Sequence, residues 1–207
     1  MIYLTEQFTQ REAGRLHALI ETHPFATLVS TTDGSAFVSH VPLRLDRDRG
    51  ERGTLLGHLS RENPHWKLLA EATQALAIFH GPHAYVSPAW YSVHPSVPTW
   101  NYAVVHASGP VHLIEDPQRV WALLLDLVRA HESPRADRWT PDLPADYLQR
   151  MVAGVVAFEL RIERLEGKFK LSQNRPESDR TRVAAALEAD GSQIGAELAA
   201  LMRSVAL

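Results

Sequence analysis

The stretch from His80 to Tyr102, HGPHAYVSPAWYSVHPSVPTWNY, carries the densest group of side chains that could bind a ligand. Five of its residues are Tyr or Trp, and four are Pro. Proline fixes φ, so aromatic side chains on a proline-rich loop lose less entropy when they cover a ligand. Long aromatic loops on a rigid scaffold are often binding loops. The stretch therefore indicates either a ligand-covering loop or a loop that packs on its own domain or on a second subunit.

A second stretch, GHLSRENPHW from Gly57 to Trp66, has the residue types of an anion-binding turn. It joins the end of a predicted strand to the start of a predicted helix, where free backbone N–H groups favour an anion. Ser60 can donate a hydrogen bond, and the Arg61 guanidinium can bind two phosphate oxygens at once. The pattern predicts a phosphate site, although many strand-to-helix turns carry Ser and Arg without one.

A third stretch, EGKFKLSQNR from Glu166 to Arg175, is a basic turn in a chain whose formal net charge is −3. Lys168, Lys170 and Arg175 make it locally positive, and its Ser, Gln and Asn residues are hydrogen-bond donors. It is either a solvated loop or part of a site for an anionic ligand.

The composition excludes several kinds of site. The chain has 207 residues and no cysteine, which rules out disulfides, Fe–S clusters and Cys-containing zinc sites. Histidine is frequent, with 11 residues, but HExxH and HxH are absent, and a Gly-Pro turn between His80 and His83 is poor metal geometry. We therefore expect no metal site. G-x-S-x-G, P-loop and G-x-G-x-x-G patterns are also absent, so hydrolase, NTPase and Rossmann interpretations lack support.

The sequence shows no sign of membrane insertion or export. No apolar run reaches about 18 residues, and the first residues, MIYLTEQFTQ, do not resemble a signal peptide. A cytoplasmic protein is the expectation.

The elements that must position these stretches are mostly short strands joined by turns. A capping box, Thr9 to Glu12, predicts a helix that ends at His23-Pro24, and Asp33-Gly34 predicts a hairpin turn. Strands are predicted over residues 25–31, 36–45, 54–59, 75–79 with 83–87, 100–114 and 155–165. Helices are predicted over residues 63–72, 117–131, 145–152, 178–189 and 192–205.

This order favours a mainly β, α+β protein with an antiparallel barrel over a doubly wound sheet, because regular crossover helices are missing. We expect one barrel domain over residues 1–175, followed by a helical hairpin over residues 176–207 that packs on the barrel or on a partner subunit.

Six sequence blocks, in this order, resemble the PaiB family, which is described as FMN-binding negative transcriptional regulators. The blocks cover nearly the whole chain, and their succession is more specific than any single block. They are HPFATLVS, VSHVPL, GHLSRENPHW, FHGPHAYVSPAWY, VPTWNYAVVHASG and LEGKFKLSQNR.

The resemblance implies an FMN-binding split β-barrel, similar to pyridoxamine-phosphate oxidases and flavin reductases, in a homodimer with flavin at the subunit interface. The strand from Thr27 to Ser30 would offer backbone groups to the isoalloxazine edge, the turn at Ser60 and Arg61 would take the phosphate, and residues of the second subunit would cover the ring. The implied cofactor-binding residues are Thr27, Leu28, Val29, Ser30, His58, Ser60, Arg61, Asn63, Trp66, Tyr85, Trp100, Asn101, Lys170, Gln173 and Arg175.

Three functions remain open at this point: a flavin-binding negative regulator, a small FMN-dependent oxidoreductase or flavin reductase, and a nucleic-acid binder that uses its last two helices. Residues 175–207 contain four cations and five anions, so the charge does not support direct DNA binding. No acid or base for catalysis stands out, and only position in the matching blocks makes His58, His83, His106 and Tyr85 candidates. Haem is a rival cofactor, without an obvious axial-ligand motif.

Overall fold

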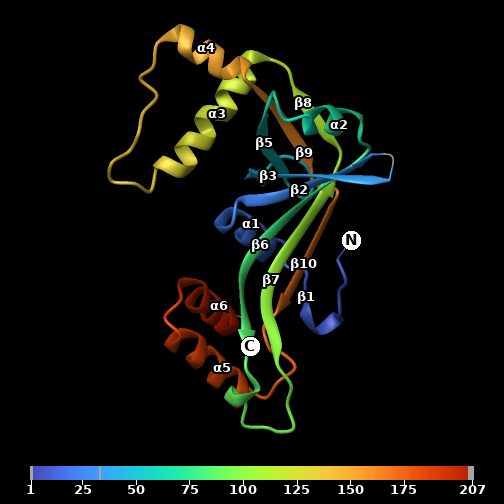
Figure 1. The fold of residues 1–207 in the computed structure, drawn as a ribbon, viewed down its shortest axis with the longest axis vertical. Helices are drawn as coiled ribbons and strands as arrows, with labels where there is room; N and C mark the ends of the chain where they lie inside the picture. Colours follow the sequence, from blue (N-terminus) through green and yellow to red (C-terminus); the bar gives the residue numbers. More distant parts are fainter. Residues whose placement is uncertain (1, 33, 205–207) are drawn as a thin grey trace. The chain divides into compact units, whose positions relative to one another are not determined.

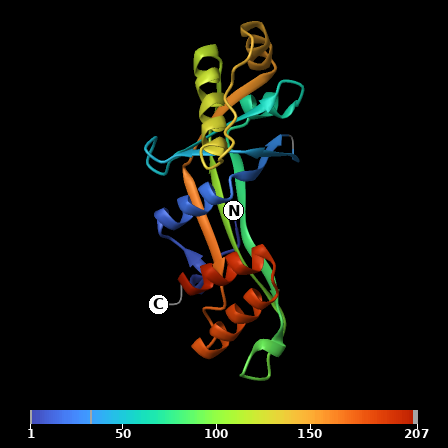
Figure 2. The same ribbon diagram turned by 90° about the vertical axis from the view of Figure 1, so that its left-hand side faces the viewer.

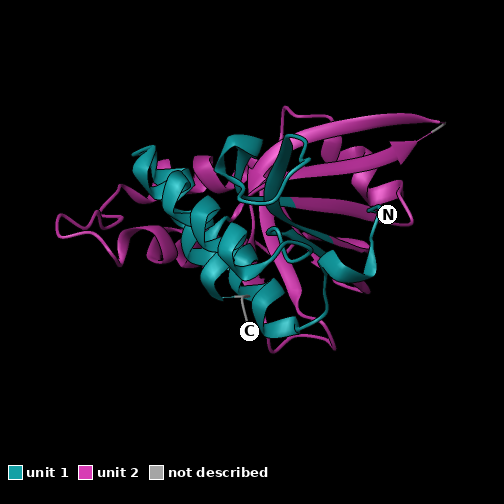
Figure 3. Ribbon diagram, turned by 90° about the horizontal axis from the view of Figure 1, so that it is seen from below, with its two compact units in different colours: residues 1–23, 79–106, 166–207 teal, residues 24–78, 107–165 magenta. Residues whose placement is uncertain are grey.

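The structure, a computed structural model, describes residues 2–32 and 34–204 (Figure 1). The chain divides into two compact units, shown in two colours in Figure 3. Unit 1 contains residues 1–23, 79–106 and 166–207, and unit 2 contains residues 24–78 and 107–165. Each unit is therefore assembled from segments that are far apart in the sequence.

Unit 2 is built on antiparallel strands. β2 (Phe25–Thr32) pairs with β3 (Ser35–Pro42) along its whole length and with β6 (Ala75–Val86) from residue 27 to residue 29. A second sheet has the order β4-β5-β9-β8, formed by Arg44–Asp46, Thr54–Ser60, Val155–Arg161 and Val111–Ile114. The longest ladder of this sheet runs from the pair Thr54 and Arg161 to the pair Ser60 and Val155.

Three helices complete unit 2: α2 (His65–Glu71), α3 (Pro117–Glu132) and α4 (Ala145–Ala153). Asp116 caps α3 as predicted, because its carboxylate accepts a hydrogen bond from the backbone N–H of Gln118 at 3.0 Å. α3 buries apolar side chains with residues of β8 and β9 in one cluster, formed by Ile114, Val120, Leu123, Leu127 and Ala157. α3 and α4 lie side by side in Figures 1 and 2.

Unit 1 contains β1 (Thr9–Gln10) and most of β10 (Arg164–Lys170). It also contains β6 from residue 79 onward and β7 (Thr99–Gly109) up to residue 106. The strand order here is β1-β10-β7-β6. Its helices are α1 (Ala13–Thr22), α5 (Glu177–Ala189) and α6 (Gln193–Ser204), with short 3-10 turns at Glu6–Phe8 and Pro88–Trp90.

The last two helices pack against each other as a hairpin. α5 buries Val183 and Leu187, and α6 buries Leu198 and Met202. Gly195 permits this close approach, because a Cβ atom at that position would lie 2.7 Å from the carbonyl oxygen of Leu187. Both helices belong to unit 1, so the predicted boundary at residue 175 does not coincide with a boundary between the compact units.

The mixed α+β class with antiparallel sheets is confirmed, but several predicted boundaries are wrong. Thr9 lies in a strand and α1 begins at Ala13, without a side-chain cap, so the predicted capping box does not form. Pro42 and Pro110 end strands that were predicted as continuous, since proline cannot donate to a ladder. The predicted strand over residues 155–165 is two strands, β9 and β10. Asp33 of the predicted turn and Val205 at the predicted helix end lie outside the described residues.

Candidate functional site

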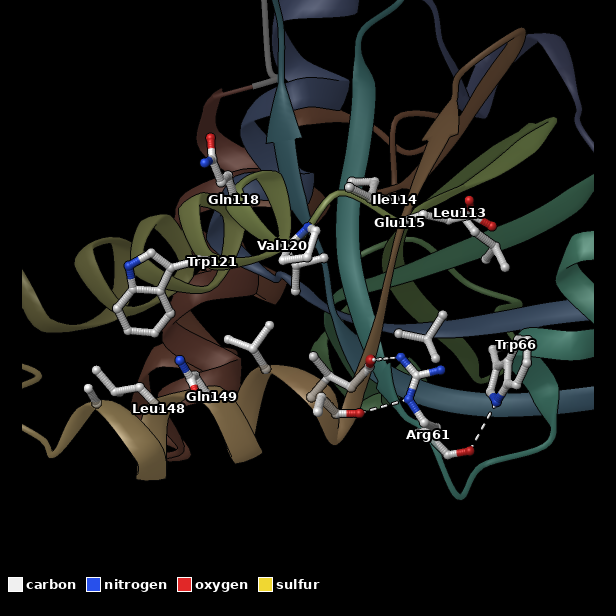
Figure 4. A pocket seen from close by; sticks show the side chains of 16 residues that line it. Arg61, Trp66, Leu113, Ile114, Glu115, Gln118, Val120, Trp121, Leu148 and Gln149 are labelled. Atoms are coloured by element: carbon white, nitrogen blue, oxygen red, sulfur yellow. Dashed lines mark hydrogen bonds between the residues drawn. The ribbon is translucent and has the colours of Figure 1, made fainter.

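Arg61 clamps the C-terminal end of α4. Its backbone N–H donates to the carbonyl oxygen of Gly154 at 2.9 Å. Its guanidinium donates to the carbonyl oxygens of Ala153 at 2.7 Å and Val155 at 2.9 Å (Figure 4). The last carbonyls of a helix lack partners within the helix, so this one residue satisfies three consecutive acceptors. The predicted phosphate-binding residue therefore also has a structural task.

The remainder of the turn from Ser60 to Trp66 is held by its own side chains. Ser60 accepts a hydrogen bond from the N–H of Glu62 at 3.3 Å, and the indole of Trp66 donates to the carbonyl oxygen of Arg61 at 3.0 Å. The Asn63 side chain accepts from the N–H of His65 at 3.0 Å, just before α2, whose N-cap is Pro64 and not Asn63 as predicted. The structure thus brings Ser60, Arg61, Asn63 and Trp66 together in one rigid turn.

His65, which the sequence analysis did not select, connects this turn to the β2–β3 hairpin. Its side chain is fully buried, and its two ring nitrogens lie 2.9 Å from Ser30 Oγ and 2.8 Å from Ser39 Oγ. Asn63 also donates to Ser39 Oγ at 3.0 Å. The Asn-Pro pair before His65 was a local signal that this residue lies at a helix start. Its role could not be predicted from that signal, because its two serine partners are 35 and 26 residues away in the sequence.

Of the four predicted cofactor-binding residues on β2, only two have accessible side chains. Leu28 and Ser30 point into the core, whereas Thr27 and Val29 lie on the more accessible face. Thr27 Oγ1 is 3.2 Å from Nδ1 of His40 on that face. Because β2 is an inner strand, its backbone from residue 27 to residue 29 is occupied by ladders on both sides. At these three positions the side chains of Thr27 and Val29 are the groups left for a ligand, whereas Ser30 lies beyond the ladder with β6. The implied contact of residues 27–30 with a flavin stays a prediction.

His58 on β5 has a buried ring nitrogen without a partner. Within the described part of the chain, nothing accepts from or donates to its Nδ1. Burial lowers its pKa below the usual value of 6.5, so the ring is neutral near pH 7. A buried polar atom of this kind is typical of a position that a ligand or an ordered water satisfies.

Unit 1 contains a small polar cavity of about 160 Å³ around two cations, Lys170 and Arg175. Lys170 Nζ donates to Thr99 Oγ1 and to the carbonyl oxygen of Trp100, and burial lowers its pKa. The Arg175 guanidinium lies 4.3 Å from the ring centroid of Tyr91 and donates to Ser96 Oγ at 3.1 Å. Two cations beside a cavity of this size suit an anionic group.

Two other predicted residues of unit 1 stabilise the turn that carries these cations. Asn101 is fully buried and donates to Ser172 Oγ at 2.8 Å. Ser172 adopts a φ of 64°, an uncommon conformation for a residue other than glycine. The Gln173 amide is occupied within its own turn, since it donates to the carbonyl oxygen of Phe169 and accepts from the N–H of Leu171. Asn101 and Gln173 therefore help to position the loop, and their contact with a cofactor stays a prediction.

Two aromatic residues of unit 1, Tyr85 and Trp100, form an exposed pair. Tyr85 and Trp100 are 47% and 54% exposed, and their rings meet edge to face at 6.2 Å. His83 lies 6.4 Å from the Trp100 ring. A cavity of about 430 Å³ next to them is also lined by His80 and His106. Large exposed rings without cover in one chain indicate a surface that a ligand or a second subunit covers.

The predicted site residues thus form two sets, one in each compact unit. Residues 27–30, His58 and the turn from Ser60 to Trp66 belong to unit 2, and the aromatic and basic residues belong to unit 1. Among the residues that the structure describes, no group of three or more His, Asp or Glu side chains could hold a metal ion. Of the helices in residues 2–32 and 34–204, none has the length and apolar character needed to cross a membrane.

Two solved structures with the same fold are described as flavin-binding proteins. The flavocytochrome Anf3 of Azotobacter vinelandii aligns with a TM-score of 0.65 and 16% identity, over 86% of this chain and 77% of that chain. The FAD and heme binding protein of Mycobacterium smegmatis aligns with a TM-score of 0.63 and 18% identity, over 89% and 80%. The fold is the flavin-binding split barrel that the resemblance implied.

The sequence family makes the assignment more specific. A family model described as "Putative FMN-binding domain" matches residues 2–164, and the chain belongs to this family, whose cofactor is FMN. The chain is also 30% identical over 206 residues to "Protease synthase and sporulation protein PAI 2" of Bacillus subtilis, covering 97% of this chain and 96% of that protein. The predicted resemblance to the PaiB family is thereby confirmed.

The side chains of each unit fit the chemistry of FMN. A phosphate requires donors and cations, and each unit has its own set: the turn at Ser60 and Arg61 in unit 2, and the cavity at Lys170 and Arg175 in unit 1. The flat ring requires stacking surfaces and polar atoms at its edge. Exposed Tyr and Trp rings, together with the unpartnered Nδ1 of His58, meet this second requirement.

The buried histidines predict how stability depends on pH. Burial lowers the pKa of His58, His65 and His106 below 6.5 in the folded protein. Between the lowered values and 6.5 the unfolded chain binds more protons, so the free energy of unfolding falls as the pH decreases through this window. We expect the midpoint of urea unfolding to drop between pH 7.5 and pH 5.5. A midpoint that rises over this interval would contradict the burial of these three rings as neutral groups.

Proposed function

We propose that this protein is an FMN-binding negative regulator of PaiB type that acts as a homodimer, with flavin bound at the subunit interface. The observation that carries the proposal is the presence, in one chain, of a hydrogen-bonded turn around Arg61 and of exposed aromatic and partly exposed basic side chains around Trp100 and Lys170. Phe25 and Val38, on the accessible face of the β2–β3 hairpin, are 66% and 48% exposed, which supports burial of this face in a dimer.

In the proposed site each set has its own task. Ser60 and Arg61 bind the phosphate and orient the cofactor, and Lys170 and Arg175 of the second subunit lie over it. Thr27, Val29 and His58 lie along the ring, and Tyr85 with Trp100 of the second subunit covers it and excludes water. FMN supplies the capacity to accept and release a hydride or single electrons, and the protein controls its access to reductants.

The geometry does not support a regulator that reads DNA with its last helices. α6 buries Leu198, Ala199 and Met202, and its single cation, Arg203, is paired with Glu188 of α5. A recognition helix needs free cations and polar donors for phosphates and base edges. We infer that regulation is exerted through the flavin or through a partner.

The second candidate is an FMN-dependent oxidoreductase or flavin reductase. The histidines of the 430 Å³ cavity favour it, because His80, His83 and His106 lie beside the exposed Trp100 and could handle protons near a bound ring.

Three measurements on the purified protein test these functions. We expect a yellow protein, or one that takes up FMN on titration, and no promoter-specific shift in electrophoresis at physiological salt. Rapid bleaching of the flavin absorption by NAD(P)H would favour the oxidoreductase over the regulator. A colourless protein that takes up no FMN would refute both, and a promoter-specific shift by the protein alone would refute the proposed indirect mode of regulation.

A further inference from the structure

Unit 2 contains a second cavity that the proposed flavin site does not use. It lies between α3 and α4 and the strands beside them, and its volume is about 880 Å³ (Figure 4). Pockets for small molecules in proteins usually measure about 300–1,000 Å³. The size therefore corresponds to a small-molecule site rather than to a packing defect.

The walls of this α3–α4 cavity are mainly apolar. Its floor includes Val120 and Val156, which belong to the buried core. At one end lie Trp121 of α3 and Leu148 of α4, and at the other end lie Arg61 and Trp66 (Figure 4). Two tryptophans at opposite ends give an aromatic molecule surfaces on which to pack.

Two polar side chains in the lining, Gln118 and Gln149, are exposed and have no partner in the described part of the protein. The side chain of Gln149 extends from α4 towards α3 (Figure 4), and Gln118 lies on α3. An amide can both donate and accept, so these two groups can orient a ligand that carries a polar substituent.

The charges in the lining argue for a neutral ligand. The only ionised side chains there are those of Arg61 and Glu115, which have opposite signs. Two guanidinium nitrogens of Arg61 are already bound to the carbonyls of residues 153 and 155. The remaining nitrogen, Nη1, is the one left for the FMN phosphate of the proposed site, and Glu115 is exposed, where water screens its charge. A carboxylate or an ammonium group would therefore lose its hydration for little gain.

From these observations we propose that the α3–α4 cavity binds a small, neutral aromatic molecule that carries a hydrogen-bonding group. The ring packs between Trp121, Leu148 and Val152, and the polar group bonds to Gln149. This site is separate from the set of residues proposed for FMN except for Arg61 and Trp66, which form one wall.

The test uses N-phenyl-1-naphthylamine, a neutral aromatic amine whose fluorescence rises in apolar sites, with the full-length protein saturated with FMN. We expect saturable binding of one probe per chain. Val152→Trp places an indole in the cavity and should weaken binding at least tenfold. Leu148→Trp, on the preceding turn of α4, is the second variant in case Val152→Trp does not fold. Gln149→Leu should weaken binding severalfold.

The matched control is Ala200→Trp, which fills the other large apolar cavity, about 760 Å³, between α1 and α6 in unit 1. We expect this variant to bind the probe like the unmodified protein. The proposal is wrong if binding is not saturable, if folded Val152→Trp and Leu148→Trp bind normally, or if Ala200→Trp abolishes binding. Probe binding that FMN displaces would also contradict it, because it would locate the probe in the flavin site.

Discussion

Replacing Arg61 with alanine is expected to weaken FMN binding about 10-fold to 150-fold, since a charged hydrogen bond to phosphate contributes about 1.5–3 kcal/mol. The same change removes the side-chain donors to Ala153 and Val155, so we also expect a lower melting temperature. The affinity is measured by titration of FMN fluorescence, and the stability by thermal unfolding followed by circular dichroism.

The two effects of Arg61 can be separated with a second variant. Arg61→Gln keeps an amide donor for one carbonyl but removes the charge, so it should regain part of the stability and none of the FMN affinity. Arg150→Ala is the matched control, because Arg150 is an exposed arginine of α4 whose side chain contacts only neighbours on its own helix, Asp146 and Tyr147, among the described residues. An unchanged dissociation constant in folded Arg61→Ala would remove Arg61 from the phosphate site.

Replacing His65 with alanine is expected to destabilise the protein by about 2–4 kcal/mol. The change leaves the hydroxyls of Ser30 and Ser39 buried without their ring partner and opens a cavity in a fully buried position. In a protein of this size, such a loss corresponds to a decrease in melting temperature of roughly 5–15 °C. Urea unfolding with an unchanged m-value would show that the loss is one of stability.

The control for His65 is His112→Ala, on the exposed side of β8, which should change the free energy of unfolding by less than about 0.5 kcal/mol. His65→Ala should also flatten part of the pH dependence described above, because one of the three neutral buried rings is removed. Full retention of stability in His65→Ala would mean that the turn is held by Asn63 and the backbone alone.

Local sequence patterns predicted the elements well where proline, capping residues and alternation agreed. Asn63-Pro64 and Asp116-Pro117 each start a helix, and β2 and β5 lie within one residue of the predicted strands. Patterns failed where two local signals competed. Thr9 to Glu12 has the spacing of a capping box, but Thr9 pairs with Lys168 in a strand instead. Long-range pairing overrode the local preference there.

The candidate site was predicted as a set of blocks, and the roles of individual residues were harder to predict. The resemblance implied a cofactor contact for Asn101 and Gln173, and each amide also makes a hydrogen bond within the protein. His65 escaped notice because its role depends on two serines that become its neighbours only in the fold. The hydrogen bonds of Arg61 to the end of α4 could not be predicted either. Their acceptors are backbone carbonyls, and every residue has one, so the sequence does not mark them.

The interleaved composition of the two units has a consequence for synthesis on the ribosome. Unit 2 needs β9, so its second sheet remains open until residue 161 has emerged, although β5 emerges about 100 residues earlier. In unit 1 the partner of β1 is β10, so β1 stays unpaired until residue 168 has been synthesised. Premature termination anywhere before residue 164 would therefore leave both units with unpaired strand edges, which are prone to aggregation.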